Sequence, residues 1–262
     1  MIDDLIPAEI YERYLTPPIY APWAEALAAL AEPKPGDRVL DVACGTGAAL
    51  RAVAPGIHPS GVAVGIDTDT AMLGVARAIR SDLDWREGSV TDLPFEDEAF
   101  SLILCQHGVP FFRDKAAALF EMHRVLMPGG RAVFGIWDSL DTSPGHHAVF
   151  TELGDLVGAD KARPVAWLLS DTGEIHELLL GAGFSEITNS TETKISHFES
   201  ARRFVELFIA GASTLTRETL AQIDDSVRES FIERVAVRLS DYDGKDGLAI
   251  PMRCHLIRAE RA

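Results

Sequence analysis

The sequence predicts an α/β fold with a doubly wound, mostly parallel sheet, an antiparallel last strand and a helical insertion as a lid. Two observations support this fold class. Apolar runs of strand length alternate with amphipathic stretches of helical period through the first half of the chain. A glycine-rich loop follows the first of these runs, where such folds bind ligands. At 262 residues and 47% hydrophobic content, we expect one domain.

The strands and helices follow one another in order. Residues 38–43 are apolar and β-branched, follow the turn residues Pro35-Gly36, and read as a buried parallel strand. Residues 61–67 repeat that signature, and Asp69 is a suitable N-cap for a helix extending to about Asp82. The pattern then predicts a strand over 100–106, a helix over 115–126, a turn at 128–130 and a strand over 131–137. Two further strands over 184–198 and 250–258 complete the sheet as its antiparallel part, preceded by a helix that begins at Asp171.

The remaining segments lie outside this alternation. We expect a core of about 36–138 plus 171–198 and 249–260, an N-terminal helical cover over 1–32, and helical insertions of about 139–170 and 199–240. Two apolar helix faces fall in the last insertion: Phe204, Val205, Phe208 and Ile209, then Leu220, Ile223, Val227, Phe231, Val235 and Leu239. They either pack on the core or form a lid over a pocket.

The charge balance argues against polyanionic partners. The chain has 24 Lys and Arg against 40 Asp and Glu, a formal charge of -16, so nucleic acid and anionic membranes would be repelled. The first residues lack the pattern of a signal peptide and no apolar run reaches membrane-spanning length, which predicts a cytoplasmic protein without membrane insertion. Cys44, Cys105 and Cys254 are far apart and predict neither disulfides nor a metal site.

The chemistry concentrates in the loop after the first strand. Asp41 ends that strand, and Gly45 and Gly47 allow the backbone to turn tightly and approach a ligand at the start of the next helix. This pattern alone also fits a purely structural turn. Asp67 ends the second strand, where a carboxylate can accept both hydroxyls of a ribose, so a nucleoside is the leading ligand.

Residue types separate the nucleoside cofactors. Leu50 stands where the dinucleotide fingerprint requires its third glycine, which disfavours NAD. No Gly-Lys-Ser/Thr triplet is present to form a phosphate loop, so nucleoside triphosphate hydrolysis is not supported.

Four linked motifs resemble those of one enzyme family. They are VLDVACGTG at 39–47, GIDTDTAML at 65–73, EGSVTDLPFEDEAFSLILC at 87–105 and HRVLMPGG at 123–130. In order and spacing they resemble the class I S-adenosylmethionine-dependent methyltransferases, in the small-molecule, ubiquinone/menaquinone-biosynthesis-like branch (methyltransferase type 11 domain). The resemblance implies a Rossmann-like fold, S-adenosylmethionine as methyl donor and S-adenosylhomocysteine as product.

The resemblance also implies roles for individual residues. It places Asp41, Ala43, Gly45 and Gly47 around the methionine portion of the cofactor, Asp67 and Thr68 at the ribose, Met72 on the adenine face, Ser89 and Val90 at the adenine edge, and Cys105 and Gln106 beside the methyl donor. Met72 is otherwise a core residue of its helix. No metal ligand is implied.

Three positions depart from the family pattern. Ala43 replaces the first glycine, and the added methyl group is tolerated if the local φ is negative. Ser101 replaces an Asp far from the cofactor, with an expected structural effect alone. Ser89 replaces the Asp that accepts from the adenine amino group, so charge assistance is lost at this edge.

Methyl transfer from a sulfonium requires mainly positioning and exclusion of water. An oxygen acceptor also needs a base, and His107 is the best candidate because it follows the fourth strand directly. A histidine hydrogen-bonded within a loop is the competing interpretation. We expect a small acceptor, flat or apolar given the aromatic residues nearby, whereas the oligomeric state is not encoded in any feature we find. A relative that binds S-adenosylmethionine without catalysis is the alternative function.

Overall fold

The computed structural model describes residues 5–211 and 224–262. The chain divides into two compact units, which we describe separately. The first comprises Met1–Ile19, Ser139–Pro164 and Thr193–Arg253, and the second comprises Tyr20–Asp138, Val165–Glu192 and Cys254–Ala262. The second unit contains most of the predicted core and also residues 20–35 and 165–170, whereas residues 193–198 and 249–253 of that core belong to the first unit.

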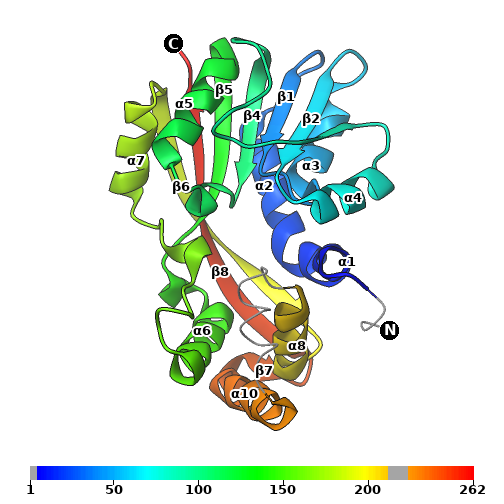
Figure 1. Cartoon of the computed structure of the whole chain (residues 1–262), viewed down its shortest axis with the longest axis vertical. Coiled ribbons are helices and arrows are strands. Elements are labelled where there is room, and N and C mark those ends of the chain that lie inside the picture. Colours follow the sequence, from blue (N-terminus) through cyan, green and yellow to red (C-terminus); the bar gives the residue numbers. More distant parts are fainter. Residues whose placement is uncertain (1–4, 212–223) are drawn as a thin grey trace. The chain divides into compact units, whose positions relative to one another are not determined.

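The second unit contains the doubly wound sheet (Figure 1). Its strands are β1 (Arg38–Val42), β2 (Val62–Asp67), β3 (Asp84–Glu87), β4 (Phe100–Gln106) and β5 (Leu126–Trp137), with parts of β6 (Ser185–Phe198) and β8 (Gly247–Glu260). The strand order is β3-β2-β1-β4-β5-β8-β6. The pairs among β1 to β5 are parallel, whereas β8 is antiparallel to β5. The predicted fold class is therefore confirmed, and the strand order reverses between β1 and β4, where such sheets bind ligands.

Helices cover both faces of this sheet. They are α2 (Ala21–Ala31), α3 (Ala48–Ile57), α4 (Thr70–Ile79), α5 (Lys115–Val125) and α7 (Thr172–Gly181), with the single turns η3 (Val109–Phe111) and η5 (Val165–Trp167). Asp69 caps α4 through the N–H groups of Ala71 and Met72, as predicted. A Cβ at Gly135 in β5 would face Leu27 of α2, whereas its neighbours Phe134 and Ile136 face α5 and α7.

The predicted turn at residues 128–130 lies inside β5 instead of before it. Leu126 already pairs with Phe100, and the register then shifts so that Arg131 pairs with Leu102. The residues in between form a bulge in which Gly129 has a φ of 73°. Because β5 pairs with β4 on both sides of Gly129 and Gly130, these glycines lie within the strand and do not mark its beginning.

A buried ion pair fixes the start of β1. The Arg131 guanidinium lies 2.7 Å from Asp37, and both side chains are about nine-tenths buried. The hydroxyl of Ser101 donates to the other oxygen of Asp37 at 2.7 Å and accepts from the Arg38 N–H at 3.0 Å. Ser101 thus has the structural role that its distance from the cofactor motifs predicts.

The first unit is mainly helical. It contains α1 (Pro7–Ile10), most of the π-helix η2 (Tyr11–Tyr20), the turns η4 (Leu140–Thr142) and η6 (Ser240–Tyr242), α6 (Pro144–Val157), α8 (Ala201–Gly211), α10 (Asp225–Arg238) and the short strand β7 (Asp243–Gly244). Glu152 of α6 is buried between Arg234 and Arg238 of α10, at 2.6 Å from each. Phe204, Phe231 and Val235 are buried, in agreement with the two predicted apolar faces. Leu220 and Ile223 lie outside the described residues, and the lid remains a prediction.

Among the described residues, no helix is both long enough and apolar enough to cross a membrane.

Candidate functional site

The loop after β1 adopts left-handed backbone conformations at three positions. Gly45 has a φ of 54°, Gly47 a φ of 83° and Ala43 a φ of 55°. The φ of Ala43 is therefore not negative, so the condition under which its added methyl group is tolerated without strain is not met. The chain must turn sharply between β1 and α3 at this point, and Ala43 adopts a conformation that is costly for a residue with a Cβ.

Trp85 of β3 explains why two nearby positions are glycines. A Cβ at Gly47 would overlap the Trp85 ring, and one at Gly65 would lie 2.5 Å from it. The ring is buried and its Nε1 donates to the carbonyl of Arg80 at 2.8 Å, so it cannot move away easily. Gly45 differs, because no described atom lies within 4 Å of a Cβ built there. The loop is therefore packed at Gly47 and open at Gly45.

Asp67 connects the ends of β1 and β2. One carboxylate oxygen accepts from the Gly45 N–H at 2.8 Å and the other from the Asp69 N–H at 2.9 Å. Burial raises the pKa of Asp67, although both hydrogen bonds act in the opposite direction. The structure thus brings Asp67 to the glycine loop, as the two motifs predict.

Asp41 and Thr46 are the buried polar side chains of this loop. One Asp41 oxygen accepts from the Leu50 N–H at 3.1 Å, while Asp41 Oδ1 and Thr46 Oγ1 have no hydrogen-bond partner within the described part of the chain. Both residues are 1% exposed. Burial raises the pKa of Asp41 to about 8; the Leu50 N–H opposes this shift and the Asp67 charge adds to it. Such atoms are costly without a partner, which indicates a ligand.

The adenine-side candidates lie at the same edge of the sheet. Asp67 pairs with Glu87, so Ser89 lies just past the end of β3 beside it. Ser89 and Thr68 are exposed, and Met72 and Val90 are half-buried. The Ser89 hydroxyl bonds to that of Thr91 at 2.9 Å. No contact in the described structure assigns these four residues to a ligand, so their roles remain predictions.

The end of β4 supplies the remaining candidates. Cys105 is fully buried, and burial raises the pKa of its thiol. The Gln106 amide donates to the carbonyl of Tyr20 at 2.8 Å, which attaches the N-terminal helical segment to this strand. Gln106 Oε1 is buried and lacks a partner among the residues described.

His107 lies within an aromatic cluster. Its ring stacks on Trp137 with centroids 3.8 Å apart and planes at 6°, and Trp137 stacks on Trp167 at 6.1 Å. The Tyr20 ring is 6.1 Å from His107, and Trp23 meets Trp137 edge-on at 5.8 Å. Both ring nitrogens of His107 are buried and bond to no described group, and burial lowers its pKa to about 3. His107 is thus a neutral imidazole with free donor and acceptor capacity.

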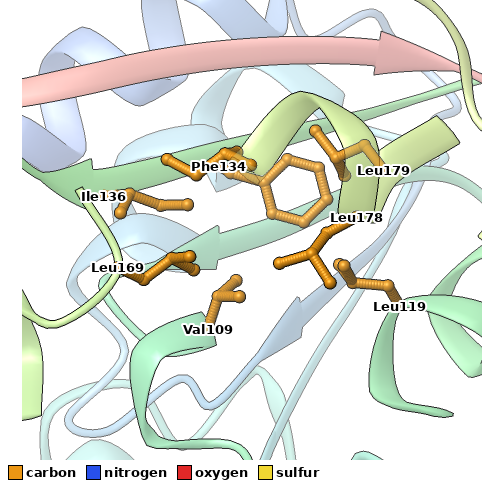
Figure 2. A pocket seen from close by; sticks show the side chains of 8 residues that line it. Val109, Leu119, Phe134, Ile136, Leu169, Leu178 and Leu179 are labelled. Atoms are coloured by element: carbon orange, nitrogen blue, oxygen red, sulfur yellow. The ribbon is translucent and has the colours of Figure 1, made fainter. Parts of the chain in front are cut away.

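An apolar pocket lies on the opposite face of β5 (Figure 2). Its lining is Val109, Leu119, Phe134, Ile136, Leu169, Ile175, Leu178 and Leu179. Because side chains alternate along a strand, Ile136 faces this pocket while Trp137 faces His107. The lining has no polar side chain and belongs to the hydrophobic core, so we do not assign a function to it.

Sequence reasoning missed Thr46 and Trp85. Thr46 lies inside the quoted motif, but its burial depends on the turn into α3. Trp85 lies in a strand of four residues that no apolar pattern predicts, yet its ring determines the shape of the loop. The available signal was a pair of glycines, at residues 47 and 65, together with one large aromatic residue, Trp85, that can pack against both.

Part of the chain is similar to known proteins. Residues 40–134 match the methyltransferase domain family Methyltransf_11. The 2-phytyl-1,4-naphtoquinone methyltransferase of Synechococcus elongatus is 39% identical over 105 residues, which cover 38% of this chain and 45% of that protein. The ubiquinone/menaquinone biosynthesis C-methyltransferase UbiE of Xanthomonas axonopodis is 37% identical over 120 residues, which cover 44% and 47%. The chain thus spans about half the length of these curated relatives.

The fold extends further than the sequence similarity. The crystal structure of the YcgJ protein from Bacillus subtilis superimposes with a TM-score of 0.61 and 17% identity, covering 91% of this chain and 98% of that one. The matched segment, residues 40–134, is thus similar to a methyltransferase domain, and the relatives that it matches include methyltransferases of quinone biosynthesis.

Proposed function

We propose that this protein transfers a methyl group from S-adenosylmethionine to a small-molecule acceptor. One observation supports the cofactor assignment most directly. Asp41 Oδ1 and Thr46 Oγ1 are buried and lack partners among the described residues, beside the glycine whose Cβ position is open. The amino-acid portion of the cofactor has an ammonium group and a carboxylate that can satisfy such atoms and the N–H groups of the loop. The residues therefore fit this cofactor.

We assign the remaining cofactor residues by their match to the family motifs. Asp67 accepts the ribose hydroxyls, with Thr68 beside them. Met72 packs on the adenine, and Ser89 and Val90 meet its edge. Cys105 and Gln106 line the methyl group. Together with Ala43 and Gly47, which shape the loop, these residues form our proposed binding set.

The bound cofactor supplies a methyl group on a positively charged sulfur, so the protein contributes positioning and a dry site. Trp137 and Tyr20 surround His107 with apolar surface that excludes water. His107 would then hydrogen-bond the polar atom of the acceptor. Its neutral state allows it to accept a proton, but the lowered pKa makes it a weak base, so we assign it mainly to orientation.

The aromatic cluster also supports a class of acceptor. We propose a flat, quinone-like or phenolic ring, because Trp137 and Trp167 form an aromatic cluster with His107. One relative is named as a naphthoquinone methyltransferase and another as a methyltransferase of ubiquinone/menaquinone biosynthesis, which supports this choice.

Two measurements test this function. Calorimetry should show saturable binding of S-adenosylmethionine and S-adenosylhomocysteine, and none of NAD because Leu50 replaces the third fingerprint glycine. Incubation with methyl-labelled donor and a panel of naphthoquinols, benzoquinols and simple phenols should give methylated products by mass spectrometry. NAD binding without a response to either adenosyl ligand would overturn the cofactor assignment. Cofactor binding without turnover on any acceptor would favour the binding-only alternative.

A further inference from the structure

Two loops that contain residues with left-handed backbone meet at the centre of the second unit. Ala43 follows β1 with a φ of 55°, and His107 follows β4 with a φ of 58°. These strands are adjacent and parallel, with Asp41 paired to Leu104, so both loops emerge at the same edge of the sheet. Non-glycine residues in this conformation persist where their surroundings enforce it.

Gly108 is the point at which the two loops touch. A Cβ at residue 108 would lie 2.7 Å from the Cβ of Ala43 and 2.9 Å from the sulfur of Cys105. The φ of Gly108 is -81°, which any residue can adopt. Close approach, and not backbone conformation, therefore explains the glycine. The methyl group that Ala43 adds to the family motif is accommodated by the hydrogen at residue 108.

His107 is held from its other side. The backbone N–H of His107 donates to the carbonyl of Gly135 at 2.7 Å, and the imidazole ring of His107 stacks on Trp137. A displacement of Ala43 would act on Gly108 and hence on the adjacent peptide of His107. The cofactor loop is thus in contact with the segment that contains His107, through the small residues Ala43 and Gly108.

We propose that Ala43 is a positioning residue that couples the cofactor loop, residues 43–47, to the orientation of His107. The coupling makes the acceptor side sensitive to occupancy of the cofactor loop, so that His107 is fixed in its working orientation when the cofactor binds. This inference rests on the proposed function for the identity of the cofactor. The contact itself does not depend on that identity.

A double-mutant cycle tests the coupling. The variants are Gly108→Ala, Ala43→Gly and the double variant, with Gly74→Ala as a matched control because no described atom lies within 4 Å of a Cβ at that position. Gly108→Ala should weaken S-adenosylhomocysteine binding about 10-fold or more, and adding Ala43→Gly should restore affinity at least about 3-fold because one of the two collisions disappears. The control should bind normally. Independent, additive effects of the two substitutions would overturn the proposal.

A second readout distinguishes coupling from simple packing. In the wild-type protein, S-adenosylhomocysteine should shift the NMR signals of the His107 imidazole, assigned by their loss in His107→Phe. In Ala43→Gly, which removes a methyl group and creates no collision, the shift at saturating ligand should be markedly smaller. Equal shifts in both proteins would overturn the coupling even if Gly108→Ala does not fold.

Failure of the proposed function can be distinguished from failure of the coupling between Ala43 and His107. If S-adenosylhomocysteine does not bind the wild-type protein, the cofactor assignment fails, and the cycle can be measured as thermal unfolding of the free protein. A non-additive change in Tm would still support the Ala43–Gly108 contact, whereas additivity would overturn it.

Discussion

The carboxylate of Asp67, at the end of β2, accepts a 2.8 Å hydrogen bond from the backbone N–H of Gly45, in the loop that follows β1. The residue proposed to bind the ribose therefore also holds the glycine loop. The sequence predicts that Asp67 contributes little to stability, because an acid at the open carboxyl end of a strand faces the ligand crevice. The bonds to Gly45 and Asp69 require a correction, because their loss would leave the loop N–H groups without an acceptor.

We expect Asp67→Ala to weaken S-adenosylmethionine binding about 10-fold to 150-fold and to lower the free energy of unfolding by about 1 to 3 kcal/mol. Asp67→Asn keeps an oxygen for Gly45 and should recover much of the stability but little of the affinity. Calorimetry and urea denaturation measure the two effects. Normal binding by folded Asp67→Ala would show that the ribose does not bind at Asp67.

Ser89→Asp, which restores the family residue, should leave S-adenosylmethionine affinity unchanged or improve it.

Gly45 and Gly47 should respond differently to the same substitution. Gly47→Ala forces a Cβ into the Trp85 ring at a φ of 83°, so we expect a loss of stability of more than about 2 kcal/mol. Gly45→Ala meets no described atom within 4 Å and should cost only about 1 kcal/mol for its backbone conformation. Its methyl group would instead occupy the space proposed for the cofactor and weaken binding more than 10-fold. Tight binding by Gly45→Ala would contradict this placement.

The pH dependence of stability should identify Asp41. Its pKa of about 8 in the folded protein lies above its ordinary value near 4, so the folded state holds a proton that the unfolded state releases. The stability contribution is complete below about pH 4 and is lost as the pH rises to about 8. Between pH 5 and 8, the Tm of the wild-type protein should therefore fall relative to that of Asp41→Asn, as scanning calorimetry would show.

The same carboxyl group should affect ligand binding in the opposite direction. The ammonium group of the cofactor favours ionised Asp41, so binding should release a proton and strengthen as the pH rises toward 8. Calorimetry in buffers of different ionisation enthalpy counts that proton. An unchanged proton release in Asp41→Asn would exclude Asp41 as its source.

His107→Phe should separate orientation from packing. Phenylalanine retains the stack on Trp137 and removes two buried nitrogens without described partners, so stability should be equal or higher. Methyl transfer should fall at least about 10-fold while S-adenosylhomocysteine affinity stays within about 2-fold. Steady-state kinetics and calorimetry supply these values. Full activity would show that His107 touches neither acceptor nor proton.

Phe208 offers a test of acceptor choice by the helical insertion. Phe204 is fully buried, so Phe204→Ala would mainly destabilise the first unit. Phe208 is half-buried against His146 and Phe150, and Phe208→Ala should change acceptor KM more than cofactor affinity. Equal losses in both would favour a packing role alone.

The parts of the fold that follow from local pattern were predictable. The order of apolar and polar residues predicts the strand over residues 38–43, the N-cap Asp69 and the strand over 250–258. The pairing of Asp67 with the glycine loop also follows, because the carboxyl ends of adjacent parallel strands share an edge.

Features that depend on contacts between distant segments were not predictable. Ala43 has a positive φ, and the room for its methyl group comes from Gly108, 65 residues later in the chain. The pKa of His107 depends on burial beside Trp137, and the shape of the glycine loop depends on Trp85. No local pattern in the sequence contains these relationships.

The carboxylate of Asp37 is shared by Arg131 and the hydroxyl of Ser101. An acid at residue 101 would bring a second negative charge against the first, with one guanidinium to balance both. Residues 37 and 101 should therefore change together during evolution: homologues with Asp at the position of Ser101 should rarely have an acid at the position of Asp37. An alignment of homologues can reveal this covariation. The double variant Asp37→Ser/Ser101→Asp would test whether the single negative charge can be moved from the start of β1 to the start of β4 without loss of stability.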